Sequence, residues 1–121
     1  NVEVTHLEEF YCYQEGDYKV GLLFNDQSKN YSFYYVDTNL IQEGSFENVD
    51  ELEKGEYRVE GDKILLTPKS ILKKEVAGKL ARTLHLMEID KGVPVEMNLL
   101  ARTFRSPKHC DSIFNEIIQL K

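Results

Sequence analysis

The sequence predicts a mainly β domain, an antiparallel up-and-down barrel of about eight strands followed by a C-terminal helix. Two observations carry this prediction. Apolar and polar residues alternate with a period of two, and turn residues break the alternation every eight to twelve residues, as is typical of antiparallel barrels and sandwiches. Near the end of the chain the apolar period changes to that of a helix. The 121 residues suit one core, so we expect a single domain over residues 1–121, with the helix at about 111–120.

Large apolar residues recur on one face of the expected strands. The eight strands are expected at residues 8–14, 18–25, 31–37, 40–46, 55–60, 63–67, 80–89 and 93–104. Because successive side chains of a strand point to opposite faces, Phe33 and Tyr35 share a face of the third strand. Together with Phe24, Tyr57 and Met97, they are the residues that we place in the barrel interior or at its mouth.

Turn and breaker residues set the limits of these strands. The pair Gly61-Asp62 predicts a two-residue type II′ hairpin turn. Pro68 ends the sixth strand, since proline cannot donate to a ladder. The acidic residues 48–54 are expected to hold one helical turn. Residues 70–79 fit either a short helix or an extension of the sixth strand.

The period changes after Pro107. Asp111 or Ser112 can cap a helix. The apolar residues that follow at helical spacing are Ile113, Phe114, Ile117, Ile118 and Leu120. We interpret this stripe as core packing rather than as a surface for a partner.

The two cysteines, Cys12 and Cys110, lie near opposite ends of the chain. In a closed eight-stranded barrel the first and last strands are neighbours, so we expect a disulfide between them, with Cα atoms about 4.4 to 6.8 Å apart. A disulfide favours an exported protein. Two buried free thiols in a cytosolic protein are the alternative reading of the same residues.

Composition and charge narrow the class of protein. The net charge is −6, and the basic residues are concentrated in the second half of the chain. This overall acidity argues against a nucleic-acid partner. The apolar runs are too short for a transmembrane segment. We expect a periplasmic or secreted protein whose signal peptide has been removed.

The residues that carry chemistry do not assemble into a motif. His6, His85 and His109 are widely spread, without the spacing of a metal site. Paired carboxylates are plentiful, but nothing in the sequence marks one that is held in an apolar environment, as acid–base catalysis requires. We therefore expect no enzyme, no metal and no cofactor. The triplet Asn30-Tyr31-Ser32 is a glycosylation sequon.

One stretch resembles a known class of proteins. Residues 44–46 read GSF, and residues 55–67 read GEYRVEGDKILLT. This stretch is similar to the central hairpin of small bacterial exported lipocalin-like barrels, which often read G-x-Y-x-V-x-G-[DN]-x-I-x-L-T. The placement of Cys12 and Cys110 also resembles the terminal disulfide of periplasmic C-type lysozyme inhibitors. The recognition signature of those inhibitors, Ser-Gly-x-x-Tyr, is absent, so no inhibitory residue is carried over.

These features lead to a functional expectation. We expect a non-enzymatic exported protein that binds a protein or cell-envelope partner. The alternative is a carrier of a small apolar ligand in the barrel interior, which eight strands leave just wide enough for side chains or one small ligand. The large inward residues favour a filled interior.

Overall fold

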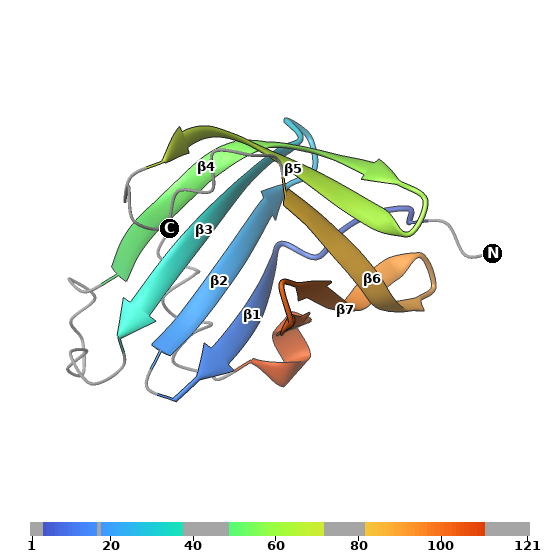
Figure 1. The fold of residues 1–121 in the computed structure, drawn as a ribbon. Helices are drawn as coiled ribbons and strands as arrows, with labels where there is room; N and C mark the ends of the chain where they lie inside the picture. The colour runs from blue at the N-terminus through green and yellow to red at the C-terminus, as the bar shows by residue number, and fades with distance from the viewer. Residues whose placement is uncertain (1–3, 17, 38–48, 72–81, 111–121) are drawn as a thin grey trace.

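The protein is an eight-stranded barrel. A computed structural model describes residues 4–16, 18–37, 49–71 and 82–110. Each strand pairs antiparallel with the next in sequence, and β1 pairs with β8 to close the barrel (Figure 1). The strands are β1 (Phe10–Glu15), β2 (Tyr18–Asn25), β3 (Asn30–Asp37), β4 (Val49–Glu60), β5 (Lys63–Ile71), β6 (Arg82–Asp90), β7 (Val93–Leu99) and β8 (Arg102–Arg105). The predicted antiparallel up-and-down barrel is confirmed.

The number of strands agrees with the prediction, but the last one was predicted wrongly. The strand expected at 93–104 is two strands, β7 and β8, joined by Leu100 and Ala101. Both turn residues have positive φ, 50° and 66°, the conformation of a type I′ turn. The Asn98 side chain accepts a hydrogen bond from Ala101 N–H and supports the turn. No glycine marks this turn, and the apolar alternation runs straight through it.

β4 and β5 are longer than predicted. The helical turn expected within 48–54 is wrong, because residues 49–54 belong to β4. The expected strand end at Pro68 is also wrong, since β5 continues to Ile71. Pro68 is tolerated at a β-bulge, where Gly55 pairs with Pro68 while Lys54 pairs with Ser70. The Gly61 φ of 60° fits the first position of the predicted hairpin turn.

Several predicted elements lie in parts of the chain that the structure does not describe. The strand at 40–46 and the helix at about 111–120 lie outside the described residues, as does the part of 70–79 beyond Ile71. The described part of the chain holds no α-helix, only a 3₁₀ turn at Pro107–His109. None of its helical residues forms a segment long and apolar enough to cross a membrane.

The interior holds one apolar core. Its fully buried apolar members, with no exposed surface, are Tyr11, Leu22, Ile64, Leu66, Leu84 and Met97. These side chains come from β1, β2, β5, β6 and β7 and meet along the barrel axis. Most of the interior is therefore filled, as expected for eight strands.

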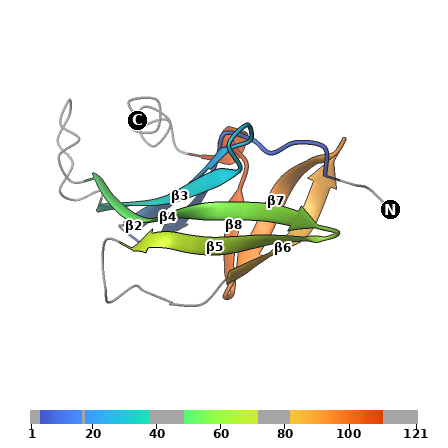
Figure 2. The same ribbon diagram turned by 90° about the horizontal axis from the view of Figure 1, so that it is seen from above.

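One end of the barrel is closed by residues 4–9, which we call the N-terminal segment. Thr5 N–H donates to Gly92 O over 2.8 Å, and Phe24 N–H donates to Glu9 O over 2.8 Å. Figure 2 shows this segment running past the ends of β6 and β7. Any other residue at position 92 would be strained, because the φ of Gly92 is 84° and a Cβ would lie 2.4 Å from the Thr5 hydroxyl. Within the segment, the Leu7 side chain is buried.

The seam between the first and last strands carries the disulfide. Cys12 on β1 is bonded to Cys110, which follows the 3₁₀ turn, and their Cα atoms are 6.0 Å apart. Cys12 also pairs through its backbone with Arg105 of β8. The predicted pairing of the cysteines is confirmed, and the reading as two free thiols is excluded.

Candidate functional site

The opposite end of the barrel, which we call the mouth, contains a pocket of about 290 Å³. Its lining comes from every strand except β5. The lining residues are Tyr13, Val20, Phe33, Tyr35, Leu52, Glu53, Arg82, Leu99, Arg102 and Phe104. Most of these side chains are apolar or aromatic. The polar groups are one carboxylate and two guanidinium groups, together with the tyrosine hydroxyls.

A β-bulge places the carboxylate in this pocket. Phe33 of β3 pairs with Glu53 of β4, but the next residue, Tyr34, pairs with Glu51. Leu52 is therefore the extra residue, and both Leu52 and Glu53 are buried. In regular pairing, adjacent side chains point to opposite faces, and a bulge changes this alternation. The bulge lets an apolar residue and an acidic residue line the same pocket.

Glu53 is 2% exposed and has two partners. The Tyr31 hydroxyl donates to its Oε2 over 2.7 Å. Arg82 Nη2 lies 3.1 Å from its Oε1 and forms an ion pair with it. Apart from this ion pair, Oε1 receives no hydrogen bond from the residues that the structure describes. Glu53 thus lines the pocket with a buried carboxylate, one oxygen of which lacks a hydrogen bond.

Tyr31 reaches Glu53 because Gly55 leaves room for its ring. Tyr31 and Gly55 are paired across β3 and β4, and a Cβ on Gly55 would lie 2.7 Å from the Tyr31 ring. Burial, and then the hydrogen bond to Glu53, raise the pKa of the Tyr31 phenol well above its usual range. The phenol therefore stays protonated and acts as the donor.

Aromatic rings form the wall around this polar group. Phe33 and Phe104 have ring centroids 6.1 Å apart, and those of Tyr13 and Phe104 are 5.7 Å apart. The Arg82 guanidinium lies over the Phe33 ring, 5.9 Å from its centroid. This contact orients Arg82 beside Glu53. Arg102 is exposed and lines the pocket as well.

The closed end has its own tyrosine–carboxylate pair. The Tyr57 hydroxyl donates to Asp26, and Lys29 Nζ lies 3.2 Å from the same carboxylate. The Tyr57 bond, followed by Lys29 and the backbone of Leu7, holds the pKa of Asp26 below its usual value. Burial raises the pKa of Tyr57. Asp26 thus joins the β2–β3 loop, β4 and the N-terminal segment.

The structure separates the residues predicted for the interior or mouth. All of them contact the core, but only Phe33 and Tyr35 line the mouth pocket. Phe24 and Tyr57 are in contact with each other, with ring centroids 4.9 Å apart, and Tyr57 is bonded to Asp26 at the closed end. Met97 is fully buried within the core.

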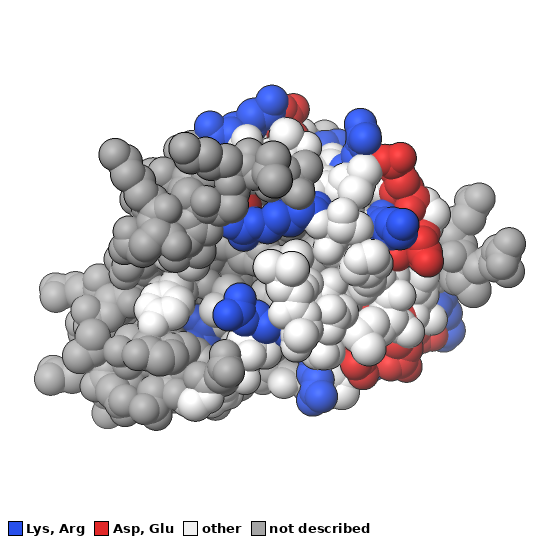
Figure 3. All heavy atoms as spheres, viewed as in Figure 1, with Lys and Arg blue, Asp and Glu red and all other residues white. Residues whose placement is uncertain are grey.

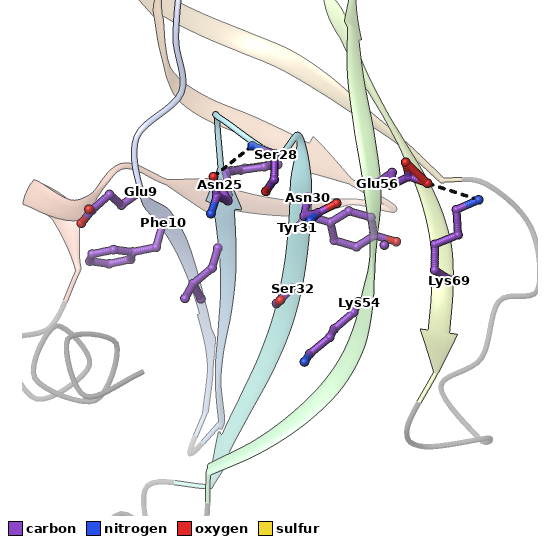
Figure 4. Close-up of a pocket in the computed structure, with 13 residues that line it drawn as sticks. Glu9, Phe10, Asn25, Ser28, Asn30, Tyr31, Ser32, Lys54, Glu56 and Lys69 are labelled. Carbon is purple, nitrogen blue, oxygen red and sulfur yellow. Dashed lines mark hydrogen bonds and ion pairs between the residues drawn. The ribbon is translucent and has the colours of Figure 1, made fainter.

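A larger hollow of about 990 Å³ lies over β2–β5 and opens to solvent. Figure 4 shows two interactions among its polar groups: Lys69 pairs with Glu56 over 3.3 Å, and Ser28 N–H donates to the Asn25 side chain. Both members of the Lys69–Glu56 pair are more than half exposed. Because these groups are exposed and already paired with one another, we regard the smaller mouth pocket as the better candidate site.

Other kinds of site find little support in the described residues. They contain no cluster of three or more His, Cys, Asp or Glu side chains that could hold a metal ion. On the face shown in Figure 3, Lys and Arg side chains are spread over several places rather than gathered in one patch. The three histidines come from separate parts of the fold: His6 from the N-terminal segment, His85 from β6 and His109 from the 3₁₀ turn.

Sequence reasoning missed Glu53, Arg82 and Tyr31. Glu53 belongs to the acidic stretch for which a helical turn was expected, and its neighbour Glu51 is a carboxylate of the same kind. Glu51 accepts a hydrogen bond from Tyr34 and is only partly buried. Only the position of the bulge distinguishes the two glutamates. The alternation predicted for residues 31–37 puts Tyr31 on the same face as Phe33 and Tyr35, and it was the one signal that pointed toward this site.

The chain was compared with known proteins in three ways. No family model, no curated protein and no solved structure matches it.

Proposed function

We propose that this protein is a non-enzymatic, exported binding protein that holds a small molecule in its mouth pocket. The observation that carries this proposal is the buried Glu53 carboxylate in the lining of an otherwise mostly apolar pocket, because one of its oxygens receives no hydrogen bond from the described residues. Ligand pockets commonly combine apolar walls with a few polar groups that fix orientation. Buried polar atoms in folded proteins usually have at least one hydrogen-bond partner, so an oxygen without one calls for an explanation.

The size of the pocket limits the ligand. An apolar cavity of about 150 Å³ can hold one benzene ring. The mouth pocket measures about 290 Å³, which suits a molecule of one or two rings rather than a long-chain lipid. The filled core below it, including Met97, Ile64 and Leu84, leaves such a ligand at the mouth.

The proposed location is periplasmic or secreted. The Cys12–Cys110 disulfide supports it, because structural disulfides persist in oxidising compartments. The sequential eight-stranded order supports a lipocalin-like assignment, since lipocalins are up-and-down barrels of the same strand number. The proposed lipocalin-like assignment rests on this barrel architecture and on the sequence motif at residues 55–67.

A protein or envelope partner remains the second candidate function. Leu100 favours it, because this side chain is 77% exposed on the β7–β8 turn, between Leu99 and the pocket residue Arg102. Exposed apolar side chains at the rim of a pocket are common in interaction sites. Replacing Leu100 with Ser should abolish capture of such a partner and leave small-molecule binding unchanged.

Filling the pocket tests the proposed function. Val20→Phe adds volume inside the mouth, whereas Val59→Phe is a matched control on β4 with Val59 39% exposed. Native mass spectrometry of protein from its own host, and thermal-shift screening of one- and two-ring compounds, measure binding. We expect Val20→Phe to lose every ligand that the wild type and Val59→Phe bind. Equal binding by all three proteins would contradict a ligand site at the mouth.

A further inference from the structure

One oxygen of Glu53 is ion-paired but receives no hydrogen bond from the described residues, and it indicates which chemical group the ligand presents. Resting on the proposed function, we infer that the mouth pocket binds a neutral aromatic molecule that donates one O–H or N–H hydrogen bond to Glu53 Oε1. This oxygen is buried and receives no hydrogen bond from the described residues, while Oε2 is already bonded to Tyr31. An ionised carboxylate can only accept hydrogen bonds, so the complementary ligand group is a donor.

The charges around the pocket favour a neutral donor over an ion. A cationic ligand would face Arg82, which is already paired with Glu53, and also Arg102. An anionic ligand would place a negative charge against a carboxylate that is 98% buried. Bringing an unpaired charge into such a site is costly. A hydroxyl or an aromatic N–H fills the acceptor position without adding a charge.

The walls favour an aromatic body for the same ligand. Phe33, Phe104 and Tyr13 surround the pocket, with neighbouring ring centroids 5.7 to 6.1 Å apart. Aromatic rings favour stacked or edge-to-face contacts at such spacings. A fused two-ring phenol, with its hydroxyl pointing to Glu53 and its rings toward these side chains, meets both requirements.

Four probes of one shape test this inference. They are 2-naphthol, 2-methylnaphthalene, 2-naphthoate and 2-naphthylmethylammonium, which present a neutral donor, a methyl group, an anion and a cation. Binding to the wild-type protein is measured by calorimetry or by ligand fluorescence. We expect 2-naphthol to bind roughly 5- to 100-fold more tightly than 2-methylnaphthalene, the range that corresponds to one buried polar group satisfied or left unpaired. Both ions should bind more weakly than 2-naphthol.

A second readout locates the donor. The Glu53 carboxyl carbon should shift in NMR spectra when 2-naphthol binds and remain nearly unchanged with 2-methylnaphthalene. In the triple variant Tyr31→Phe/Glu53→Leu/Arg82→Met, similar-sized apolar residues replace the whole polar group, a change that buried ion pairs often tolerate. This variant should bind 2-naphthol and 2-methylnaphthalene equally.

The outcomes separate this inference from the proposed function. If no probe binds the wild type, the proposed small-molecule site is wrong. If 2-naphthol and 2-methylnaphthalene bind with equal affinity, the site stands and the donor inference is overturned. Tightest binding of 2-naphthoate or of the ammonium compound would also overturn it. The wild-type series alone decides between these results, even if the triple variant does not fold.

Discussion

The two ends of the barrel use the same pair of groups for different purposes. At the closed end, Tyr57 and Asp26 are joined by Lys29 and by the backbone of the N-terminal segment. At the mouth, Tyr31 and Glu53 are joined by Arg82, but one carboxylate oxygen receives no hydrogen bond from the described residues. Asp26 is partly exposed, whereas Glu53 is 98% buried. The polar group at the closed end fastens a segment of the chain, whereas the one at the mouth is the group that we propose to receive a ligand.

The largest expected loss of stability follows removal of the disulfide at the seam between β1 and β8, beside the mouth. Replacing Cys12 and Cys110 with Ser removes a crosslink between residues 98 positions apart. Loops of this length are worth roughly 4–5 kcal/mol by the chain-entropy model. Urea unfolding of the double variant and of the reduced wild type should give the same loss. A loss below about 1 kcal/mol would mean that strand pairing alone holds the seam.

The next prediction concerns how much the ion pair between Arg82 and the buried Glu53 stabilises the fold. Arg82→Met leaves a buried carboxylate without its cation and should cost about 3–4 kcal/mol of unfolding free energy. Lys69→Met is the matched control, because it breaks an ion pair with Glu56 in which both side chains are more than half exposed. We expect a change within about 0.5 kcal/mol for the control. Equal losses in the two variants would contradict the contrast between a buried mouth pair and a solvated one.

Alkaline unfolding measures the buried phenols at both ends. Burial raises the pKa of Tyr11, Tyr31 and Tyr57 above the usual value of 10.0. Their contribution to stability is fully present below pH 10 and is lost as the pH rises, because the unfolded chain releases these protons first. Each of them should lower the unfolding free energy by about 1.4 kcal/mol per pH unit above pH 10. Urea titrations between pH 9 and 11.5 measure this dependence of the unfolding free energy on pH. Tyr31→Phe and Tyr57→Phe should each reduce the slope by about 1.4 kcal/mol per pH unit. An unchanged slope would contradict burial of the phenol that was replaced.

The smallest effect compares two turn residues, one at each end. Ala101 at the mouth has a φ of 66°, and Lys29 at the closed end has a φ of 58°. Glycine adopts this conformation without strain, so Ala101→Gly should stabilise the protein by about 1 kcal/mol. Lys29→Gly relieves the same strain but removes the ion pair with Asp26, so its gain should be smaller. Thermal unfolding of both variants checks the order, and a larger gain at Lys29 would mean that its ion pair contributes nothing.

The sequence predicted the pairing of the barrel better than its irregularities. β2 was predicted with its observed bounds, and the cysteine pair followed from closure of the first strand on the last. Alternation reports which face of a regular strand is buried. It cannot report the bulge at Leu52, because an extra residue in one strand is visible only against its partner. The turn at Leu100 was missed for a related reason, since its residues are not those that usually mark a turn.

The candidate site lies at those irregularities, which explains why it was not predicted. Phe33 and Tyr35 were placed correctly on the inner face, and both line the pocket. Glu53 fell in the acidic stretch 48–54, for which one helical turn was expected, because the deeper burial of Glu53 than of Glu51 depends on long-range pairing. Arg82 begins β6, beyond a stretch that the sequence left ambiguous. The apolar wall was therefore predictable, and the polar group at its centre was not.

Pairing of β1 with β8 has a consequence for biosynthesis. During synthesis the chain emerges from its N-terminus, so β1 is exposed long before β8. The pairing of β1 with β8 therefore cannot form until nearly all strands are available. Until then one edge of β1 and the Cys12 thiol are unpaired, a state in which strands associate with other chains. A chaperone that covers β1 during synthesis, or an enzyme that oxidises the Cys12 thiol to the disulfide once Cys110 is available, would therefore raise the yield of closed barrels.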